Sequence, residues 1–197
     1  MKKIYLIGFL ILTSIFSFAQ TDEEVMDKLT QKAASMKCMN CHFTQNKTMA
    51  MLAEPIVSEG LMDYIAPDKL RWEYTSPYSF ALLADGEKIT KITEGNEDVL
   101  DAKSGRMYQG IVNIIMSSAT GRDLFDKSTF DVVITEDGAF WKAEMTPKKR
   151  DMKRVFSMLT FYFDKSNNVI SKVEMTEAGG DVTMIQFYDM KTNELCD

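Results

Sequence analysis

Three cysteines and one histidine are the residues of this chain whose types and spacing could do chemistry. Cys38, Cys41 and His42 form the pattern C-x-x-C-H, and the third cysteine is Cys196. This pattern is the attachment motif of c-type haem, and a C-x-x-C pair can also act as a redox-active dithiol. In an oxidising compartment the same cysteines could instead supply one disulfide and one free thiol.

The surroundings of this motif favour a disulfide. The motif lies where a strand is expected to begin, whereas a haem-attachment motif would open a helix, and no thioredoxin-like βαβ pattern surrounds it. A bridge from Cys196 to Cys38 or Cys41 would close a long loop and stabilise the fold by several kcal/mol in the chain-entropy model. We favour Cys41 because it shares a strand phase with Phe43, but the sequence leaves the pairing open.

Charge and histidine content exclude several classes of function. The 197 residues include 23 Lys and Arg against 29 Asp and Glu, which gives a formal net charge of -6. Nucleic acids and anionic membranes reward clustered positive charge, so neither is expected as the main partner. Because His42 is the only histidine, a His-rich metal site is impossible, as is a Ser-His-Asp triad on any other histidine. We expect no enzyme activity, no metal and no cofactor.

The first residues have the composition of a signal peptide. Two lysines near the start precede the apolar stretch Ile4–Phe18, and the small residues Ser17 and Ala19 fit cleavage after Ala19. A membrane-spanning helix needs about 20 apolar residues, and this stretch is shorter and is followed by an acidic run. We therefore predict a signal peptide at residues 1–19 and one exported, soluble domain at residues 20–197.

Three helices are expected to accompany the strands. Thr21–Lys37 begins with Thr21 and Glu24 at the spacing of a capping box. Its apolar residues recur at the spacing of one helix face: Val25, Leu29, Ala33 and Met36. Two shorter helices are expected at Ser104–Ser118 and Gly121–Lys127. Residues 110–116 are apolar on nearly every side, so this helix must be covered on more than one face, as a lid over an apolar cavity or as a buried helix.

Most of the remaining chain alternates with the period of two that is typical of strands. Asp-Gly, Asn-Asn and Gly-Gly pairs mark turns between many of the segments. The predicted strands are Cys41–Met51, Ile56–Ile65, Lys69–Thr75, Ser79–Ala84, Lys88–Thr93, Phe130–Thr135, Phe140–Thr146, Val155–Phe163, Val169–Thr176 and Val182–Tyr188. One antiparallel sheet of about ten strands is the economical arrangement, and a sheet of that length must curl or close.

Several of these segments resemble one known family. Phe43-Thr44-Gln45, then Ser58–Tyr64, then the Pro67–Pro77 segment with its pattern P-x-x-L-R-W-x-Y-x-x-P, and then the Asp85-Gly86 turn are similar to the LolA family of periplasmic outer-membrane lipoprotein carriers. Later segments also fall in the family's order, so the resemblance covers nearly all of residues 20–197. The resemblance implies an α+β fold, in which about three helices form a lid over a single strongly curved antiparallel sheet. That sheet is a half-open β-barrel of ten to eleven strands.

The same resemblance assigns candidate residues to an apolar cavity for acyl chains. Alternation sends Leu70, Trp72 and Tyr74 to one face of their strand, and Arg71 and Glu73 to the other. Ordinary core packing would give the same pattern. The candidate cavity residues are Phe43, Met62, Tyr64, Leu70, Trp72, Tyr74, Leu83, Ile111, Ile114 and Ile115. Ala66 stands where many proteobacterial members carry an arginine that holds the lid, so we expect a different latch here.

The function implied by the resemblance is that of a monomeric periplasmic carrier without a catalytic residue. It would accept acylated lipoproteins from an inner-membrane lipoprotein-releasing ABC transporter and pass them to an outer-membrane acceptor. The absence of a cysteine at the predicted cleavage site favours the carrier over the related acceptor, which is itself lipidated. Two alternatives are a lipid-binding or lipoprotein-binding envelope-stress sensor on the same fold, and a c-type haem electron-transfer protein that uses Cys38, Cys41 and His42.

Overall fold

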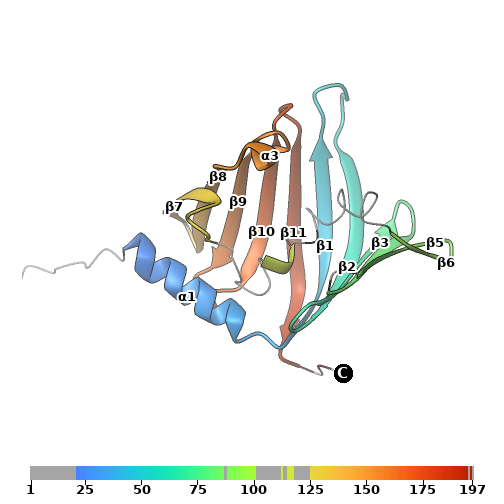
Figure 1. The fold of residues 1–197 in the computed structure, drawn as a ribbon, viewed down its shortest axis with the longest axis horizontal. Helices are drawn as coiled ribbons and strands as arrows, with labels where there is room; N and C mark the ends of the chain where they lie inside the picture. Colours follow the sequence, from blue (N-terminus) through green and yellow to red (C-terminus); the bar gives the residue numbers. More distant parts are fainter. Residues whose placement is uncertain are drawn as a thin grey trace, which may run out of the picture.

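A computed structural model describes residues 21–86, 88–100, 112, 115–117, 125–194 and 196. The predicted signal peptide at residues 1–19 lies outside the described residues, as do Ile111 and Ile114. In the described part, one strongly bent sheet carries helix α1 (Asp22–Ala34) across its open side (Figure 1). No helix in this part of the chain is long and apolar enough to cross a membrane.

The described residues form eleven strands in a single antiparallel sheet. The strands are β1 (Cys38–Thr48), β2 (Ile56–Ile65), β3 (Lys69–Ser76), β4 (Phe80–Asp85), β5 (Lys88–Thr93), β6 (Asn96–Val99), β7 (Phe130–Asp137), β8 (Phe140–Pro147), β9 (Phe156–Asp164), β10 (Ile170–Glu177) and β11 (Val182–Thr192). Their order is β6-β5-β4-β3-β2-β1-β11-β10-β9-β8-β7. Strands that follow each other in sequence are neighbours, and the pairing of β1 with β11 joins the two halves.

The ten predicted strands are all present, with ends that move by a few residues. The predicted turns are confirmed as well, since Gly86, Gly138, Asn168 and Gly180 all have positive φ angles. Strand β6 was not predicted, because its residues Asn96–Val99 are exposed and mostly polar and show no alternation. It pairs with β5 at the edge of the sheet, where one neighbour is enough to hold it.

Helix α1 starts as its sequence predicts. The Glu24 amide donates to the Thr21 hydroxyl, and the Thr21 amide donates to the Glu24 carboxylate, each over 3.3 Å. This capping box satisfies two amides that would otherwise lack partners at the helix start. One face of the helix is buried and comprises Val25, Met26, Leu29 and Ala33. The helix ends at Ala34, three residues before the predicted end at Lys37.

The other predicted helices are confirmed only in part. Val112 and the segment 115–117 are helical, which agrees with a helix over Ser104–Ser118. Within the predicted helix Gly121–Lys127, the described residues 125–127 are not helical, and the rest lie outside the described residues. A short helix, α3 (Arg150–Lys153), was not predicted, because a single charged turn carries no apolar periodicity.

The disulfide joins Cys38 to Cys196, with the two Cα atoms 5.4 Å apart. The prediction that Cys41 is the partner is therefore wrong. Cys41 does share the strand phase of Phe43, but that phase faces the buried interior, where its thiol is free and fully buried. Cys38 opens β1 beside the end of β11, and Cys196 follows β11, so the pairing of these two strands brings the cysteines together.

The same geometry argues against a haem at the C-x-x-C-H motif. Cys38 and Cys41 are three residues apart on a strand, so their side chains point to opposite faces. His42 lies on the exposed face, where its Nδ1 is 3.6 Å from a carboxylate oxygen of Asp189. Because Cys38 is held in the disulfide and Cys41 faces the interior, the two thiols cannot both bond one haem in this fold.

Candidate functional site

The predicted cavity residues on β1, β2 and β3 lie together on the concave face of the sheet. Five of them are at most 3% exposed: Phe43, Met62, Tyr64, Leu70 and Trp72. The strand register places them in adjacent rows, because Met62 pairs with Trp72 and Tyr64 pairs with Leu70. Alternation in the sequence therefore identified one wall of the interior. Tyr74 is the next inward residue of β3 and is partly buried.

The prediction for Leu83 is wrong, and Leu82 takes its place. The turn after β3 pairs Tyr74 with Phe80, so the even-numbered residues of β4 face inward like those of β3. Leu82 pairs with Trp72 and is buried, whereas Leu83 pairs with Arg71 on the convex face. A shift of one residue along a strand reverses the face to which the side chain points. The sequence of β4, with two adjacent leucines, did not fix this phase.

Aromatic rings form the centre of this wall. The ring of Phe43 is stacked on the indole of Trp72, with centroids 3.9 Å apart and an interplanar angle of 21°. Tyr74 contacts both rings edge-on, and Phe187 from β11 contacts Trp72 edge-on at 6.2 Å. Such pairs contribute free energy beyond the area that they bury. The wall is therefore a fixed aromatic surface that spans β11, β1 and β3.

Two buried polar atoms on the concave face, one on β3 and one on β5, have no hydrogen-bond partner among the described residues. They are the indole Nε1 of Trp72 and the hydroxyl Oγ1 of Thr93. The neighbouring Tyr74 hydroxyl, in contrast, donates to the Gln45 side-chain oxygen over 2.9 Å. Burial raises the pKa of Tyr74, while nearby Trp72 and Gln45 lower it in part, so the hydroxyl stays protonated at neutral pH.

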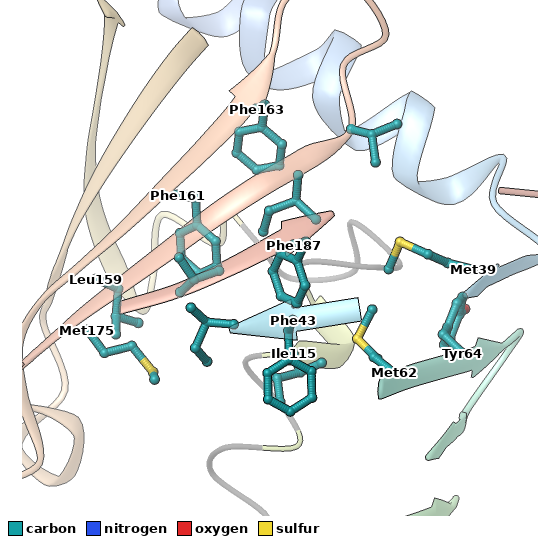
Figure 2. Close-up of a cluster of buried hydrophobic side chains, with 14 of the residues drawn as sticks. Met39, Phe43, Met62, Tyr64, Ile115, Leu159, Phe161, Phe163, Met175 and Phe187 are labelled. Atoms are coloured by element: carbon teal, nitrogen blue, oxygen red, sulfur yellow. The ribbon is translucent and has the colours of Figure 1, made fainter. Parts of the chain in front are cut away.

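The opposite wall comes from the second half of the sheet and was not among the predicted site residues. Its buried side chains include Met145, Leu159, Phe161, Phe163, Val173 and Ile185. Figure 2 shows Leu159, Phe161, Phe163 and Met175 from this wall beside Phe187, Phe43 and Met62 from the first. The alternation of Leu159, Phe161 and Phe163 could have identified it, since these large apolar residues share one strand phase.

Helix α1 and the segment around residue 115 cover the concave face. Val25, Met26, Leu29 and Met36 belong to the same buried cluster as the two walls, and so do Val112 and Ile115. Ile115 is 5% exposed, which agrees with its predicted place on the interior. In this closed arrangement the described candidate residues other than Leu83 belong to one continuous hydrophobic core, so any ligand would have to displace part of the cover.

Few polar contacts hold helix α1 in place. Lys127 forms an ion pair with Glu23 over 2.7 Å, and both side chains are mostly exposed. The backbone amide of Ile134 on β7 donates to the Asp22 carboxylate over 3.4 Å. Exposed ion pairs contribute little to stability. Among the described residues, these contacts join α1 to β7 and to the segment before it.

The convex face differs in chemistry from the interior. Arg71 is paired with Glu73 and Lys142 with Glu144, each pair two residues apart along one strand. Lys172 lies over the ring of Tyr162, with its Nζ 3.6 Å from the centroid. Among the described residues no group of three or more His, Cys, Asp or Glu side chains could hold a metal ion.

The fold is a curled antiparallel sheet whose concave, aromatic face is covered by helix α1 and the segment around residue 115. The family model of the outer membrane lipoprotein carrier protein LolA matches residues 34–197. The chain therefore belongs to the LolA family. This is a family of carrier proteins and not of enzymes.

Two curated relatives are both named outer-membrane lipoprotein carrier protein. One, from Methylobacillus flagellatus, is 31% identical over 160 residues, which cover 81% of this chain and 74% of the relative. The other, from Xanthomonas campestris, is 29% identical over 185 residues, with 92% and 84% covered. The resemblance read from the Pro67–Pro77 segment is thus confirmed over most of the chain.

Solved structures resemble this chain at low sequence identity. A LolA superfamily protein from Nitrosomonas europaea is 12% identical with a TM-score of 0.45, covering 90% of this chain and 96% of that one. In the MucA/MucB complex of Pseudomonas aeruginosa, one chain is 10% identical with a TM-score of 0.51. The match covers 87% of this chain and 56% of that one. At these identities the likeness concerns the fold alone.

Proposed function

We propose that this protein carries acylated lipoproteins through the periplasm by holding their acyl chains against the concave face of its sheet. The observation that carries the proposal is the continuous apolar surface formed by both walls and covered by α1 and Ile115. The exported location rests on the predicted signal peptide at residues 1–19. The donor would be an inner-membrane ABC transporter, and the recipient an outer-membrane acceptor.

The energetics of an acyl chain explain what such a carrier must do. Each buried CH₂ group is worth about 0.8 kcal/mol, so a lipoprotein with several chains does not cross an aqueous space unaided. The concave face offers apolar contact from Phe43, Trp72, Leu159 and Phe161 in place of membrane lipid. No bond is made or broken, so the mechanism needs binding, shielding and release but no catalytic group.

Loading requires the cover to move. In the closed form the residues of α1 already occupy the contacts that acyl chains would make. The chains and the helix therefore compete for the same surface, and this competition keeps the affinity moderate, as release to an acceptor requires. The exposed pair between Glu23 and Lys127 adds little resistance to opening.

A reversible lock on helix α1 tests this mechanism. We would replace Glu23 and Lys127 by cysteine in a Cys41→Ala background, which leaves the Cys38–Cys196 disulfide intact, and join them with a cleavable bismaleimide. Spheroplasts with labelled lipoproteins would be incubated with the protein, and lipoprotein released into the soluble fraction would be measured. We expect release by the open protein, none by the locked protein and recovery after cleavage of the linker.

A matched control uses the same linker between cysteines at positions 142 and 172. Lys142 and Lys172 both neighbour Tyr162 in register on the convex face, so this link spans strands without restraining α1. It should leave release unchanged. Equal release by the α1-locked protein would refute the lid mechanism, and no release by the open protein would refute transport. Lipid binding without release to membranes would favour a sensor.

A further inference from the structure

Trp72 carries a buried hydrogen-bond donor that the fold leaves unused. Its side chain is 2% exposed, and its Nε1 has no acceptor among the described residues. The Tyr74 hydroxyl donates to Gln45, and it lies close enough to the indole for Trp72 to lower the pKa of Tyr74, but the indole N–H forms no hydrogen bond of full geometry with it. A buried N–H without an acceptor has lost its bonds to water without replacement. A ligand that offers this N–H a hydrogen-bond acceptor would therefore bind more tightly than one that does not.

Thr93 supplies a second unsatisfied atom on the same face. Its Oγ1 is buried without a partner among the described residues. Thr93 pairs with Phe80, and Phe80 pairs with Tyr74, so the register places the threonine on the concave side of the sheet. Two unpaired polar atoms thus occur on the inward face of β3 to β5, which also carries the Tyr74 hydroxyl and the Lys91 ammonium among its apolar side chains.

The surroundings specify the class of ligand group. An indole N–H can only donate, so the ligand must present an acceptor. Phe43, Phe187 and Leu82 surround the indole with apolar surface, and moving an ionised headgroup there would be costly. The cation on this face, Lys91, is partly exposed and lies over the ring of Phe80 at 5.9 Å. A neutral carbonyl oxygen fits such a site better than a phosphate or carboxylate.

We propose that Trp72 and Thr93 bind the ester or amide carbonyls that attach the acyl chains to the cargo. The inference rests on the proposed function, since the cargo must enter the concave face to reach these atoms. The carbonyls mark the boundary between the acyl chains and the polar part of the lipoprotein. Their capture by Trp72 and Thr93 sets how deeply the chains enter, while the rest of the wall accepts chains of any kind.

Two probes with equal chains isolate the carbonyl. Dioctanoylglycerol contains two ester carbonyls, and 1,2-di-O-octylglycerol has the same chains and hydroxyl but ether links instead. We expect the ester probe to bind about five-fold more tightly than the ether probe, the ratio that one neutral hydrogen bond of ordinary strength gives. Trp72→Phe should remove this ratio even if both affinities fall, and Thr93→Val should reduce it. Trp141→Phe is the matched control and should keep the ratio.

A spectroscopic measurement tests the contact without altering Trp72. The protein has two tryptophans, so Trp141→Phe leaves one indole resonance in a ¹H–¹⁵N spectrum. The ester probe should shift this resonance downfield, and the ether probe should not. If both probes bind equally and neither shifts the resonance downfield, the carbonyl site is refuted and the carrier function stands. If neither probe binds, the carbonyl site and the acyl-binding function both fail.

Discussion

Gly60 on β2 lies directly under the ring of Phe43 on β1. The two residues are paired in register, and a Cβ atom on Gly60 would overlap both the Phe43 ring and the backbone oxygen of Glu73. The missing side chain is what allows the phenyl ring to lie across the strand and stack on Trp72. The central aromatic stack of the interior therefore depends on a glycine.

This relationship predicts a severe effect of Gly60→Ala. The added methyl group must displace a main-chain atom or the stacked ring, and we expect a loss of about 3 kcal/mol in the free energy of unfolding. Urea denaturation measures the loss. Gly179→Ala is the matched control, because nothing lies within 4 Å of a Cβ there, and its stability should stay close to that of the unaltered protein. Equal stabilities of the two variants would contradict the packing described.

The phase of β4 gives a second prediction. Leu82→Ala removes a buried side chain opposite Trp72 and should cost about 3 kcal/mol. Leu83→Ala alters the convex face and should cost less than about 1 kcal/mol. The two variants carry the same substitution at neighbouring positions. Thermal or urea unfolding of both therefore shows which leucine is buried in the interior. If Leu83→Ala were the more destabilising variant, Leu83 and not Leu82 would face the interior.

The disulfide gives a third prediction. Cys38 and Cys196 are 158 residues apart, and closing so long a loop should stabilise the fold by about 5 kcal/mol in the chain-entropy model. Cys196→Ser and Cys38→Ser should each lose this amount, and a reducing agent should destabilise the unaltered protein similarly. Cys41→Ala should keep its sensitivity to reductant. A Cys41 variant that no longer responds to reductant would show that Cys41 takes part in the bridge.

The buried thiol of Cys41 gives a fourth prediction, for high pH. Burial, assisted by the charge of Asp63, raises the pKa of Cys41 from 9.0 to about 12. Between these values the unfolded chain has lost the thiol proton and the folded protein has kept it. Stability from this group is therefore complete below about pH 9 and is lost as the pH rises toward 12. Urea unfolding from pH 8 to 11 should show this decline.

Cys41→Ala provides the reference for that measurement. Lysines and tyrosines titrate in the same range in both proteins, so the difference between the two stability curves isolates Cys41. The difference in the free energy of unfolding between the unaltered protein and Cys41→Ala should become smaller or change sign as the pH rises above 9. Iodoacetamide at pH 8 should also leave Cys41 unmodified in the folded protein and label it after denaturation. Rapid labelling of the folded protein would contradict its burial.

The strands of the sheet could be predicted from the sequence because the patterns that mark a strand or a turn lie within a few neighbouring residues. Alternation and paired turn residues locate a strand without knowledge of its neighbours, and Asp137-Gly138 is such a turn. The length of the predicted sheet required it to curl or close, and the family resemblance added the helical cover. The short polar strand β6 and the single turn of α3 carry neither signal, so they could not be predicted.

The candidate site was predicted less completely, because its details depend on register. The phase of Leu82 and Leu83 is set by the turn that pairs Tyr74 with Phe80, and two adjacent leucines fit either phase. The disulfide partner depends on where β1 meets β11, some 150 residues later in the chain. The lack of partners for Trp72 Nε1 and Thr93 Oγ1 is visible only once the side chains are in place.

The junction of β1 with β11 has a consequence for the order of folding. Every other strand pair consists of strands that follow each other in the chain, so each half of the sheet can assemble from local hairpins. The junction joins segments from opposite ends of the described chain, and contacts so distant in sequence form late, because the entropy of closing the loop must be overcome first. Phe187 reaches Trp72 only across this junction. The aromatic contact between β3 and β11 is therefore expected to form only after each half of the sheet has assembled.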